Sequence, residues 1–470
     1  MSFPVDVVVM AAGKGTRMKS QRPKVLHRLG GRALAQHVID CAARLSARSV
    51  VVITGHGAEQ VEAGLSAPVA CGDHVAPQLR FVRQEPQLGT GHAVQQAAPV
   101  LPEDGVTLVL SGDVPLTRPE TLQALLDLCA GECLALLTLD MPDPTGYGRI
   151  VRAAGGSVQA IVEHKDASEA QRAIPEIYSG IMAVPTRLLR GWLARLDNRN
   201  VQGEYYLTDV VKLAVADGLP VVAHRIADAV QVAGVNSPAQ LAELERAYQR
   251  RLAEALMEQG VRLADPARLD VRGELVCEED VEIDVNCVFE GRVELRSGAR
   301  IGANCFIANA VIESGAEILP FTHMQGEKAG ISVGPGAQVG PFARLRPGAQ
   351  LGAHVHIGNF VEVKNSTLAA GAKANHLAYL GDATVGERVN YGAGSITANY
   401  DGANKHRTVI EADVHVGSNC VLVAPVTLGA GGTVGGGSTI TKSTPPGALS
   451  VARGKQVSIE SWQRPQKKKV

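Results

Sequence analysis

The sequence is poor in aromatic residues, and it lacks the marks of several common protein classes. Phe, Trp and Tyr make up only 4% of its 470 residues, whereas glycine occurs 51 times. The eight cysteines include no C-x-x-C pair, so the sequence indicates neither a zinc site nor a disulfide framework, and buried free thiols are expected. The cysteines stand at positions 41, 71, 129, 133, 277, 287, 305 and 420.

Membrane and nucleic-acid signals are also missing. The N-terminus lacks the cationic, apolar and small-residue order of a signal peptide, and no apolar run is long enough to span a bilayer. We therefore expect a cytoplasmic protein. The 46 basic and 47 acidic residues leave a formal charge of −1, which favours neither nucleic acid nor an anionic membrane as the main partner. Small anionic substrates remain possible, and the length predicts two or three domains.

The first part of the chain, up to about residue 228, alternates short β-branched runs with amphipathic stretches. The runs are "VDVVVM" (5–10), "SVVVIT" (49–54), "VTLVLSGD" (106–113) and "LALLTLD" (134–140). Between the first two, Leu34, Val38, Cys41 and Leu45 share one helical face. This β-α-β pattern predicts a mostly parallel sheet with helices on both sides, with ligands bound at the carboxyl ends of the strands.

A single long helix is expected after this part. Ser237 is a typical N-cap, Pro238 suits the first turn, and the helical pattern continues to Gly260. Its apolar stripe is narrow, which fits a connecting arm between domains better than a core helix. The stripe consists of Leu241, Leu244, Tyr248 and Leu252.

From about residue 263 the apolar positions recur every six residues. Six is neither a helical nor a simple strand period, and it is typical of the hexapeptide repeat of a parallel β-helix, in which about 18 residues make one triangular coil. Some 190 residues would form about ten coils. The alternative fold is a glycine-rich β-sandwich of short strands, but it does not explain why three separate runs keep a spacing of six residues. The runs are Ile283, Phe289, Leu295, Ile301 and Ile307; Val333, Val339, Leu345, Leu351, Ile357 and Val363; and Val416, Leu422, Leu428, Val434 and Ile440.

Two polar stretches interrupt the repeat. "HMQGEKAG" (323–330) and "NYDGANKHR" (399–407) are too polar for the interior of the stack. Both are therefore predicted to project as loops from coil corners, where solenoids commonly bind their ligands.

The first apolar run leads into "AAGKGTRM" (11–18), which has the composition of a phosphate-binding loop. The glycine spacing fits neither a Walker A loop nor a dinucleotide fingerprint. What remains is a strand, a glycine turn that lets the backbone approach a ligand, and the cations Lys14 and Arg17. The residues favour a polyphosphate ligand, although a tight turn with solvated charges would give the same pattern.

An ordered set of motifs in both halves closely resembles the family of bifunctional bacterial N-acetylglucosamine-1-phosphate uridyltransferases / glucosamine-1-phosphate N-acetyltransferases. The match spans nearly the whole chain. The motifs are "AAGKGTRM", "PKVL", "QLGTGHA", "GDVPL", "GYGRI", "VEHKDA", "GEYYLTD" and "GVN", then "GPFARLRPG", "GNFVEVK", "HLAYLGD", "NYGAG", "NYDGANKH" and "VLVAPVT".

The resemblance implies a Rossmann-like α/β nucleotidyltransferase domain with a mixed sheet, followed by a left-handed parallel β-helix. We accordingly expect a uridylyltransferase domain over 1–228, a linker with the helical arm over 229–262, an acetyltransferase β-helix over 263–455 and a flexible basic tail over 456–470. The family forms homotrimers, which implies the same for this chain.

The first implied activity is uridylyl transfer from UTP to N-acetylglucosamine 1-phosphate, with release of pyrophosphate. Asp113 and Asn236 would hold Mg²⁺, because one carboxylate and one amide oxygen leave room for phosphate oxygens and water. Gln84, Gly89 and Thr90 match the segment that reads uracil. The remaining nucleotide and sugar-phosphate contacts would be Ala11, Ala12, Gly13, Lys14, Arg17, Lys24, Ser111, Gly112, Gly148, Glu163 and Tyr178.

Three positions depart from the family pattern. Tyr178 stands where asparagine is usual, so either its hydroxyl substitutes for the amide or neighbouring groups take over. Ser111 stands where tyrosine is common, and Gly436 where alanine is common.

The second implied activity is acetyl transfer from acetyl-CoA to glucosamine 1-phosphate. The amine must lose a proton before it attacks the thioester, and histidine suits this near neutral pH; the resemblance gives the role to His376. Arg346 and Lys364 would grip the phosphate, Tyr379 and Asn390 would position the sugar, and Lys405 would assist. Acetyl-CoA would contact Ala393, Asn399, Tyr400, Ser418, Gly436 and Arg453.

Two alternatives stay open at this stage. The chain could be a monofunctional nucleotidyltransferase whose β-helix is only a trimerisation or regulatory scaffold, but a pure scaffold has no reason to combine the five polar residues of the acetyl-acceptor site. It could also be a structural solenoid with a degenerate N-terminal domain, against which Lys14, Arg17, Lys24 and Asp113 speak.

Overall fold

The computed structural model describes residues 3–66 and 76–467. It divides into two compact units, residues 1–248 and 249–470. The division falls inside a helix, so the domain borders expected at 228 and 263 stay predictions. Cys71 and the last three residues of the basic tail lie outside the described residues. No helix in the described ranges is both long and apolar enough to cross a membrane.

The N-terminal unit is built on one mixed sheet, as predicted. Four neighbouring strands, β6, β1, β4 and β5, run parallel, whereas β10 lies antiparallel between β6 and β7. The sheet order is β11 (Val221–Ile226), β7 (Leu134–Asp140), β10 (Glu176–Pro185), β6 (Val106–Ser111), β1 (Val5–Met10), β4 (Ser49–Thr54) and β5 (Gln78–Arg83); β8 (Arg149–Arg152) and β9 (Val158–Val162) extend from β10.

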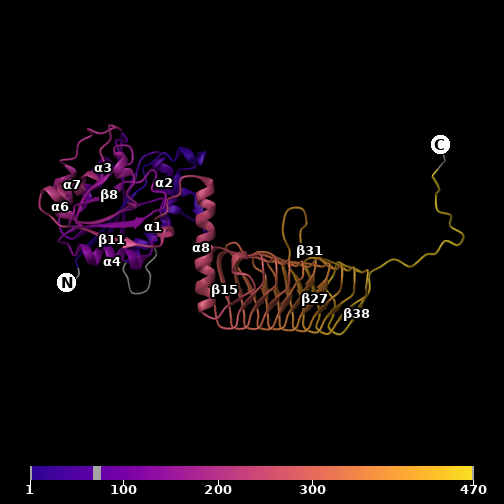
Figure 1. Cartoon of the computed structure of the whole chain (residues 1–470). Coiled ribbons are helices and arrows are strands. Elements are labelled where there is room, and N and C mark those ends of the chain that lie inside the picture. The colour runs from indigo at the N-terminus through magenta and orange to yellow at the C-terminus, as the bar shows by residue number, and fades with distance from the viewer. Residues whose placement is uncertain (1–2, 67–75, 468–470) are drawn as a thin grey trace. The chain divides into compact units, whose positions relative to one another are not determined.

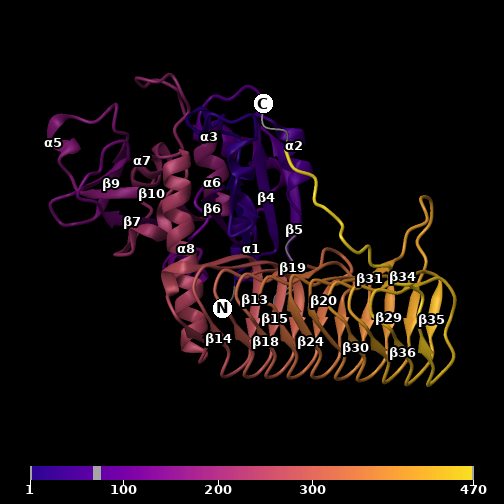
Figure 2. The ribbon, with the colours of Figure 1, turned by 90° about the vertical axis from the view of Figure 1, so that its right-hand side faces the viewer.

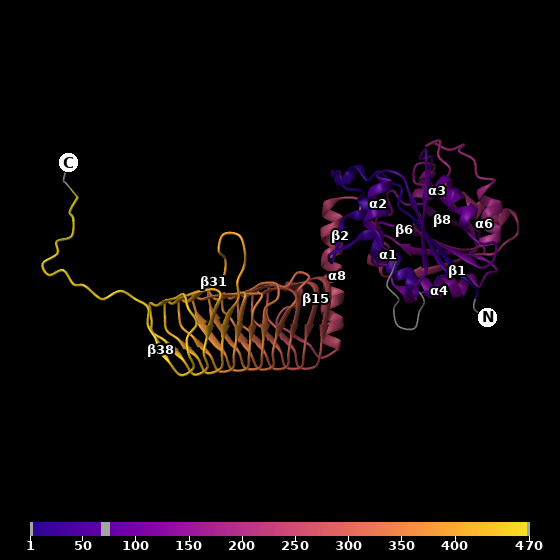
Figure 3. The same cartoon turned by 180° about the vertical axis from the view of Figure 1, so that it is seen from behind.

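Helices cover both faces of this sheet, because its central strands bury the side chains of both faces. Val7 and Val9 face one apolar cluster and Val8 faces another. Helices α1 (Leu34–Ala43) and α4 (Pro119–Cys129) supply the first cluster. Helices α3 (Thr90–Ala97), α6 (Thr186–Leu193) and α7 (Asp209–Ala216) supply the second. Figure 3 shows α3 and α4 on opposite sides of the strands.

Smaller elements complete the N-terminal unit. They are the 3-10 turns η1 (Thr16–Met18), η2 (Lys24–Leu26), η3 (Ala98–Val100) and η4 (Ala229–Val232), the hairpin β2 (Arg28–Leu29) and β3 (Arg32–Ala33), and the helices α2 (Ala58–Gly64) and α5 (Glu169–Arg172).

The expected long helix is α8 (Pro238–Glu258). The backbone N–H of Gln240 donates to Ser237 Oγ at 3.3 Å, which confirms the predicted N-cap. The narrow stripe serves two cores in turn. Leu244, with Leu241 and Tyr248, packs on Met18, Leu29 and Leu34 of the first unit. Leu252 contacts the core of the second unit, which includes Ala253 and Leu256.

The C-terminal unit is a parallel β-helix whose strands form three columns (Figure 2). The first column contains β12 (Arg262–Leu263), β14 (Glu282–Ile283), β16 (Arg300–Ile301), β18 (Glu317–Ile318), β21 (Gln338–Val339), β24 (His356–Asn359), β27 (Lys373–His376), β30 (Asn390–Tyr391), β33 (His415–Val416), β36 (Thr433–Val434) and β38 (Leu449–Ser450). The second column continues from β17 through β19 (His323–Gln325), β22 (Arg344–Leu345), β25 (Glu362–Lys364), β28 (Tyr379–Gly381), β31 (Ile396–Ala398), β34 (Val421–Val423) and β37 (Thr439–Ile440). The third contains β20 (Ile331–Val333), β23 (Gln350–Leu351), β26 (Thr367–Leu368), β29 (Ala383–Val385), β32 (Thr408–Ile410) and β35 (Val426–Leu428). The long strands β13 (Leu269–Cys277), β15 (Cys287–Leu295) and β17 (Phe306–Ile312) open the stack after the turn η5 (Pro266–Arg268).

The period of six correctly identified the interior of the β-helix. Every aliphatic or aromatic residue of the three predicted runs is buried and belongs to one continuous core. Equivalent residues stack on one another; for example, Ile283 lies in register with Ile301, and Ile301 with Ile318. Each coil thus buries about one apolar side chain per face, which leaves little room for large aromatic rings.

The two predicted insertions differ in outcome. Residues 401–405 are exposed, and Figure 1 shows their loop leaving the stack near β31. The prediction of a loop over 323–330 is wrong for its first three residues, because His323–Gln325 forms β19 and Met324 is fully buried in register with Ile307. The tail from 451 to 467 is exposed and forms no helix or strand.

Candidate functional site

The first group of predicted site residues gathers where the parallel strands of the N-terminal unit end. The loop 11–15 follows β1, Gln84 follows β5, and Gly112 and Asp113 follow β6. These strands run in the same direction, so their carboxyl ends meet at one edge of the sheet, where such folds bind ligands.

The loop after β1 is fixed at its beginning and open further on. The Ala11 N–H donates to Ile53 O at 2.9 Å, and Ala12 O accepts from Gln87 Nε2 at 2.7 Å. Gly13 and Lys14 are exposed, and a Cβ at position 13 would have no atom within 4 Å. Arg17 is also exposed, in η1. The loop therefore exposes backbone groups at Gly13 and the cationic side chains of Lys14 and Arg17, all of which a ligand can reach.

Gly15 lies directly against the side chain of Lys24. Its φ is +59°, and a Cβ at this position would lie 2.6 Å from Lys24 Cβ. Only glycine allows both this left-handed backbone and so close an approach. The loop is thereby held against the stem of Lys24.

Lys24, Asp113 and Asn236 form the polar centre of this edge. Lys24 Nζ lies 2.5 Å from Asp113 Oδ2 and 3.1 Å from Asn236 Oδ1. Both charged side chains are less than a fifth exposed. The Val235 N–H donates to Asp113 O at 2.9 Å, which ties the Asn236 segment to the end of β6.

The oxygen atoms of Asp113 and Asn236 suit a magnesium ion. A carboxylate and an amide oxygen are hard ligands, and Mg²⁺ usually takes one or two protein ligands together with phosphate oxygens and water. Within residues 3–66 and 76–467 no cluster of three or more His, Cys, Asp or Glu side chains could hold a metal by itself. The donor set therefore fits an ion that is shared with a substrate.

The predicted uracil-reading segment is held from two sides. Gln84 is buried and donates through Nε2 to Gly89 O at 2.9 Å. Thr90 Oγ1 accepts from the Leu207 N–H at 3.1 Å. These bonds fix residues 84–90 at the sheet edge and against the "GEYYLTD" segment.

The predicted sugar contacts Gly148 and Glu163 are neighbours. A Cβ on Gly148 would lie 3.7 Å from Glu163 Oε1, and Thr208 Oγ1 donates to the same oxygen at 2.9 Å. Burial raises the pKa of the Glu163 carboxyl, and the hydrogen bond from Thr208 opposes this effect. Glu163 is thus a partly desolvated carboxyl beside Gly148, where a Cβ would also lie 2.7 Å from Ile161 Cγ2, so that only glycine fits there without a shift.

Tyr178 lies next to this pair. Its N–H donates to Gly148 O at 2.9 Å, and its ring is buried in the cluster that includes Ile161. Its hydroxyl is buried and has no hydrogen-bond partner in the part of the chain that the structure describes. Burial and the nearby Glu163 raise the pKa of the phenol. The replacement of the usual asparagine therefore introduces an unsatisfied polar atom.

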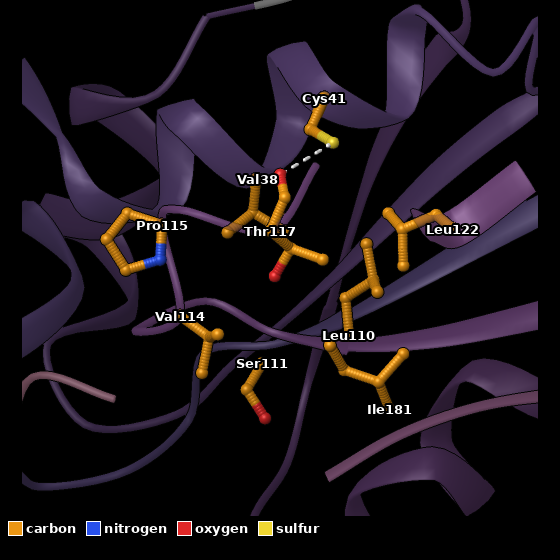
Figure 4. A pocket seen from close by; sticks show the side chains of 9 residues that line it. All are labelled: Val38, Cys41, Leu110, Ser111, Val114, Pro115, Thr117, Leu122 and Ile181. Atoms are coloured by element: carbon orange, nitrogen blue, oxygen red, sulfur yellow. Dashed lines mark hydrogen bonds between the residues drawn. The ribbon is translucent and has the colours of Figure 1, made fainter. Parts of the chain in front are cut away.

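Ser111 borders a small cavity (Figure 4). The cavity holds about 10 Å³, which is room for one water molecule at most. Cys41 also lines it and donates through Sγ to Thr117 O at 3.4 Å. Burial raises the pKa of Cys41 to about 12, so this thiol is an inert buried one, as predicted.

The second group of predicted site residues lies on the β-helix around His376. His376 is exposed at the end of β27, and its Nδ1 lies 2.7 Å from Asn359 Oδ1 on the preceding coil. An amide oxygen only accepts hydrogen bonds, so Nδ1 donates this one, and in the neutral ring Nε2 then carries the lone pair. Tyr379 begins the next strand of the same coil, and Asn390 begins the next strand of the same column.

Three cations gather beside this histidine's coil. Arg346 Nη1 donates to Glu362 Oε1 at 2.9 Å. Lys364 approaches Lys405 of the projecting loop, and this approach, together with burial, lowers the pKa of Lys364. Like charges held together in this way indicate a site for an anion.

The predicted acetyl-CoA contacts follow His376 along one corner of the stack. The Gly394 N–H donates to His376 O, the Asn419 N–H to Ala393 O, and the Gly437 N–H to Ser418 O. Arg453 Nη1 donates to Gly436 O at 2.7 Å. A Cβ on Gly436 would lie 3.3 Å from Ser418 O, so the alanine that is usual here would need only a small shift.

The remaining two contacts stand at the base of the projecting loop. Asn399 is buried and donates through Nδ2 to Asp382, whereas Tyr400 is exposed and donates through its hydroxyl to Gly402 O at 2.6 Å.

Sequence reasoning missed Asn359, Glu362 and Asp382, although all three stand in quoted motifs. A signal for Asn359 existed: it precedes His376 by 17 residues, which is about one coil. Residues one coil apart lie side by side in a β-helix, so the repeat length itself points to this partner.

Comparisons with known proteins agree with this two-part organisation. Residues 7–180 match the MobA-like NTP transferase domain, and residues 330–365 match the bacterial transferase hexapeptide (six repeats). Among solved structures, UDP-glucose pyrophosphorylase complexed with UDP-glucose is 16% identical, covers 53% of this chain and 99% of its own, and has a TM-score of 0.44; so weak a likeness supports no conclusion.

Full-length relatives are much more similar. The bifunctional protein GlmU of Polaromonas naphthalenivorans is 78% identical over 99% of this chain and 98% of its own length. That of Acidovorax ebreus is 72% identical over 98% of each chain. The chain therefore belongs to the GlmU family of bifunctional proteins and joins a nucleotidyltransferase to a hexapeptide acyltransferase.

Proposed function

We propose that this enzyme makes UDP-N-acetylglucosamine in two steps. The β-helix transfers the acetyl group of acetyl-CoA to glucosamine 1-phosphate. The N-terminal unit then transfers the uridylyl group of UTP to the N-acetylglucosamine 1-phosphate formed. The observation that carries the proposal is the presence, in a chain of this family, of two separate polar centres: Lys24 with Asp113 and Asn236, and His376 with its neighbouring cations.

In the acetyl transfer, His376 is the general base. Its Nε2 takes a proton from the ammonium of the sugar, and the free amine attacks the thioester carbonyl. A C–N bond forms and the C–S bond breaks. The nitrogen loses a second proton as it becomes an amide, and this proton balances the one that the sulfur takes up, so CoA leaves as the thiol. A general base of this kind contributes about 100- to 10,000-fold to a rate.

The charges around His376 hold the acceptor. Arg346, Lys364 and Lys405 bind its phosphate, and a cluster of cations suits a dianion. Tyr379 and Asn390 position the sugar ring. Acetyl-CoA contacts Ala393, Asn399, Tyr400, Ser418, Gly436 and Arg453.

In the uridylyl transfer, the nucleophile is already an anion, so positioning and charge neutralisation matter more than proton transfer. A phosphate oxygen of the sugar attacks the α-phosphorus of UTP, a P–O bond forms, and the bond to the leaving pyrophosphate breaks. Lys14 and Arg17 oppose the charge of the triphosphate, and Lys24 holds a phosphate of substrate or product. Ala11, Ala12 and Gly13 lie against the nucleotide.

Asp113 and Asn236 would hold Mg²⁺, which when bound neutralises part of the phosphate charge. Gln84, Gly89 and Thr90 read uracil. The sugar lies against Gly148, Glu163 and Tyr178, close to Ser111 and Gly112.

The proposal includes assembly and location. Hexapeptide solenoids expose flat faces, and the family resemblance supports a homotrimer. UTP and acetyl-CoA are metabolites of the cytoplasm, which is where we place the enzyme.

Substrate omission tests the proposal. The full chain is supplied with glucosamine 1-phosphate, acetyl-CoA, UTP and Mg²⁺, and both the CoA thiol and pyrophosphate are followed; N-acetylglucosamine 1-phosphate with UTP then isolates the second step. We expect thiol release without UTP, and pyrophosphate from the second mixture without acetyl-CoA. Pyrophosphate without any thiol release would contradict the acetyltransferase assignment.

A further inference from the structure

Asp382 is a buried acidic residue that no step of the two reactions uses. It follows β28 and is only 7% exposed. Its Oδ1 accepts from Asn365 Nδ2 at 2.5 Å, and its Oδ2 accepts from Asn399 Nδ2. A buried carboxylate is costly unless it is paired and hydrogen-bonded, so these two amides satisfy a charge that the fold keeps at this point.

The same residue holds both ends of the projecting loop 399–407. The loop begins at Asn399, which binds the carboxylate of Asp382. It returns at Thr408, whose N–H donates to Asp382 O at 3.2 Å. The His406 N–H donates to Asn399 O at 2.8 Å and closes the base of the loop. Asp382 is therefore the point at which the loop leaves and rejoins the stack.

Asp382 also contacts the segment of Lys364, which is one of the three cations proposed to bind the sugar phosphate; the other two are Arg346 and Lys405. Its N–H donates to Lys364 O at 3.1 Å. Lys405 and Arg346 disfavour the charged form of Lys364, whereas the negative charge of Asp382 favours it, although more weakly than Lys405 opposes it. One carboxylate thus contacts the loop that carries Lys405 and lies close to the ammonium that Lys405 approaches.

We propose that Asp382 is a positioning residue of the acetyl-transfer site: it clamps the 399–407 loop so that Lys405 and Tyr400 reach their places, and it counterbalances the cations that bind the sugar phosphate. This inference rests on the proposed acetyltransferase function. A corner residue with only a structural role would affect folding but would not change how the binding of glucosamine 1-phosphate depends on pH.

The chain offers a matched control. Asp413 is also a corner aspartate with a positive φ, of 61° against 50° for Asp382. It is exposed and its carboxylate pairs with Arg388 at 2.7 Å. Asp413→Asn therefore removes the same charge from the same kind of corner without touching the loop.

The test compares Asp382→Asn, Asp413→Asn and the unchanged full-length chain. KM for glucosamine 1-phosphate, KM for acetyl-CoA and kcat of thiol release are measured between pH 7 and 9.5. For Asp382→Asn we expect KM for glucosamine 1-phosphate to rise about tenfold, as for the loss of one charge-assisted contact, and KM for acetyl-CoA to rise severalfold. The increase grows with pH, because Lys364 loses its proton more readily. For Asp413→Asn we expect both KM values and kcat to equal those of the unchanged chain. All three proteins should form pyrophosphate at the same rate.

A second variant covers the case in which Asp382→Asn does not fold. Asn365→Ala removes one amide from the carboxylate and leaves the charge and every proposed substrate contact in place; we expect the same direction at roughly threefold. The proposal is overturned if both KM values of the folded variants stay within twofold of the unchanged chain, or if kcat alone falls. Absence of thiol release from the unchanged chain would instead overturn the proposed function itself.

Discussion

His376 Nδ1 lies 2.7 Å from Asn359 Oδ1, on neighbouring coils of the β-helix. The neutral amide orients the ring and fixes its tautomer without adding a charge. Triads that use a carboxylate in this place stabilise the imidazolium as well. The arrangement here therefore orients the ring without placing a negative charge against it, and Nε2 is the nitrogen left to take the proton of the amine in the proposed acetyl transfer.

Replacing this amide by a carboxylate should move the pH profile. In Asn359→Asp the new charge stabilises the protonated ring, so we expect the acid limb of kcat/KM for thiol release to shift to higher pH by about one unit or more. Asn359→Ala should lower kcat about tenfold or more without such a shift, because the ring loses its orientation. Both variants should keep pyrophosphate formation. An unmoved limb in Asn359→Asp would show that the contact does not govern the base.

The binding of glucosamine 1-phosphate by Lys364 should weaken as the pH rises. Lys405 lowers the pKa of Lys364. Lys364 therefore carries its positive charge at pH values below this lowered pKa, and its contribution to phosphate binding disappears as the pH rises through the pKa. We expect KM for glucosamine 1-phosphate to rise with pH earlier than an ordinary lysine would allow.

Lys405→Met tests this assignment of the shift. The variant should bind the phosphate more weakly at neutral pH, because one cation is missing, yet its alkaline limb should lie at higher pH than that of the unchanged chain. KM measured across the pH range separates the two effects. A limb that moves to lower pH in Lys405→Met would contradict the like-charge contact.

Gly15→Ala should damage the N-terminal site alone. The alanine has an unfavourable left-handed φ, which costs about 1–2 kcal/mol, and its Cβ would lie 2.6 Å from Lys24 Cβ. Lys24 must then move away from Asp113, and we expect pyrophosphate formation to fall at least about tenfold. Gly155→Ala is the control, since a Cβ there has open space within 4 Å. Thiol release should be equal in both variants.

The sequence predicts the repeating parts of this molecule well. It predicts poorly the contacts between residues that lie far apart along the chain. The strands over 5–10 and 49–54 and the hexapeptide interior follow from periodicity, because burial depends on local spacing. The strand at Met324 was not predicted because polar residues flank this methionine. A β-helix strand needs only one inward side chain, so His323 and Gln325 can face outward.

The residues themselves indicated a polyphosphate loop at 11–18, but the other members of the candidate sites were predictable only through the family resemblance. Lys24 meets Asp113 across 89 residues and Asn236 across 212, and no local pattern encodes such a meeting. Asp382 was missed for a different reason: a corner aspartate is usually a turn residue, and its tie to Asn399 becomes visible only when the loop is in place.

Tyr178 gives the last prediction, because its buried hydroxyl has opposite effects on stability and on binding. A buried polar group without a partner costs about 1–3 kcal/mol, and the hydroxyl of Tyr178 is such a group in the described chain. We expect Tyr178→Phe to raise the melting temperature by a few degrees, because the unpaired hydroxyl is gone, and to raise KM for N-acetylglucosamine 1-phosphate severalfold, because the sugar loses this hydroxyl as a partner. Tyr178→Asn restores the usual amide but leaves a cavity in the cluster around Ile161, so it should bind the sugar and lose stability. Thermal unfolding with and without the sugar phosphate, together with pyrophosphate kinetics, distinguishes these outcomes. Unchanged KM in Tyr178→Phe would mean that the sugar does not contact the hydroxyl and that neighbouring groups have taken over the role of the amide.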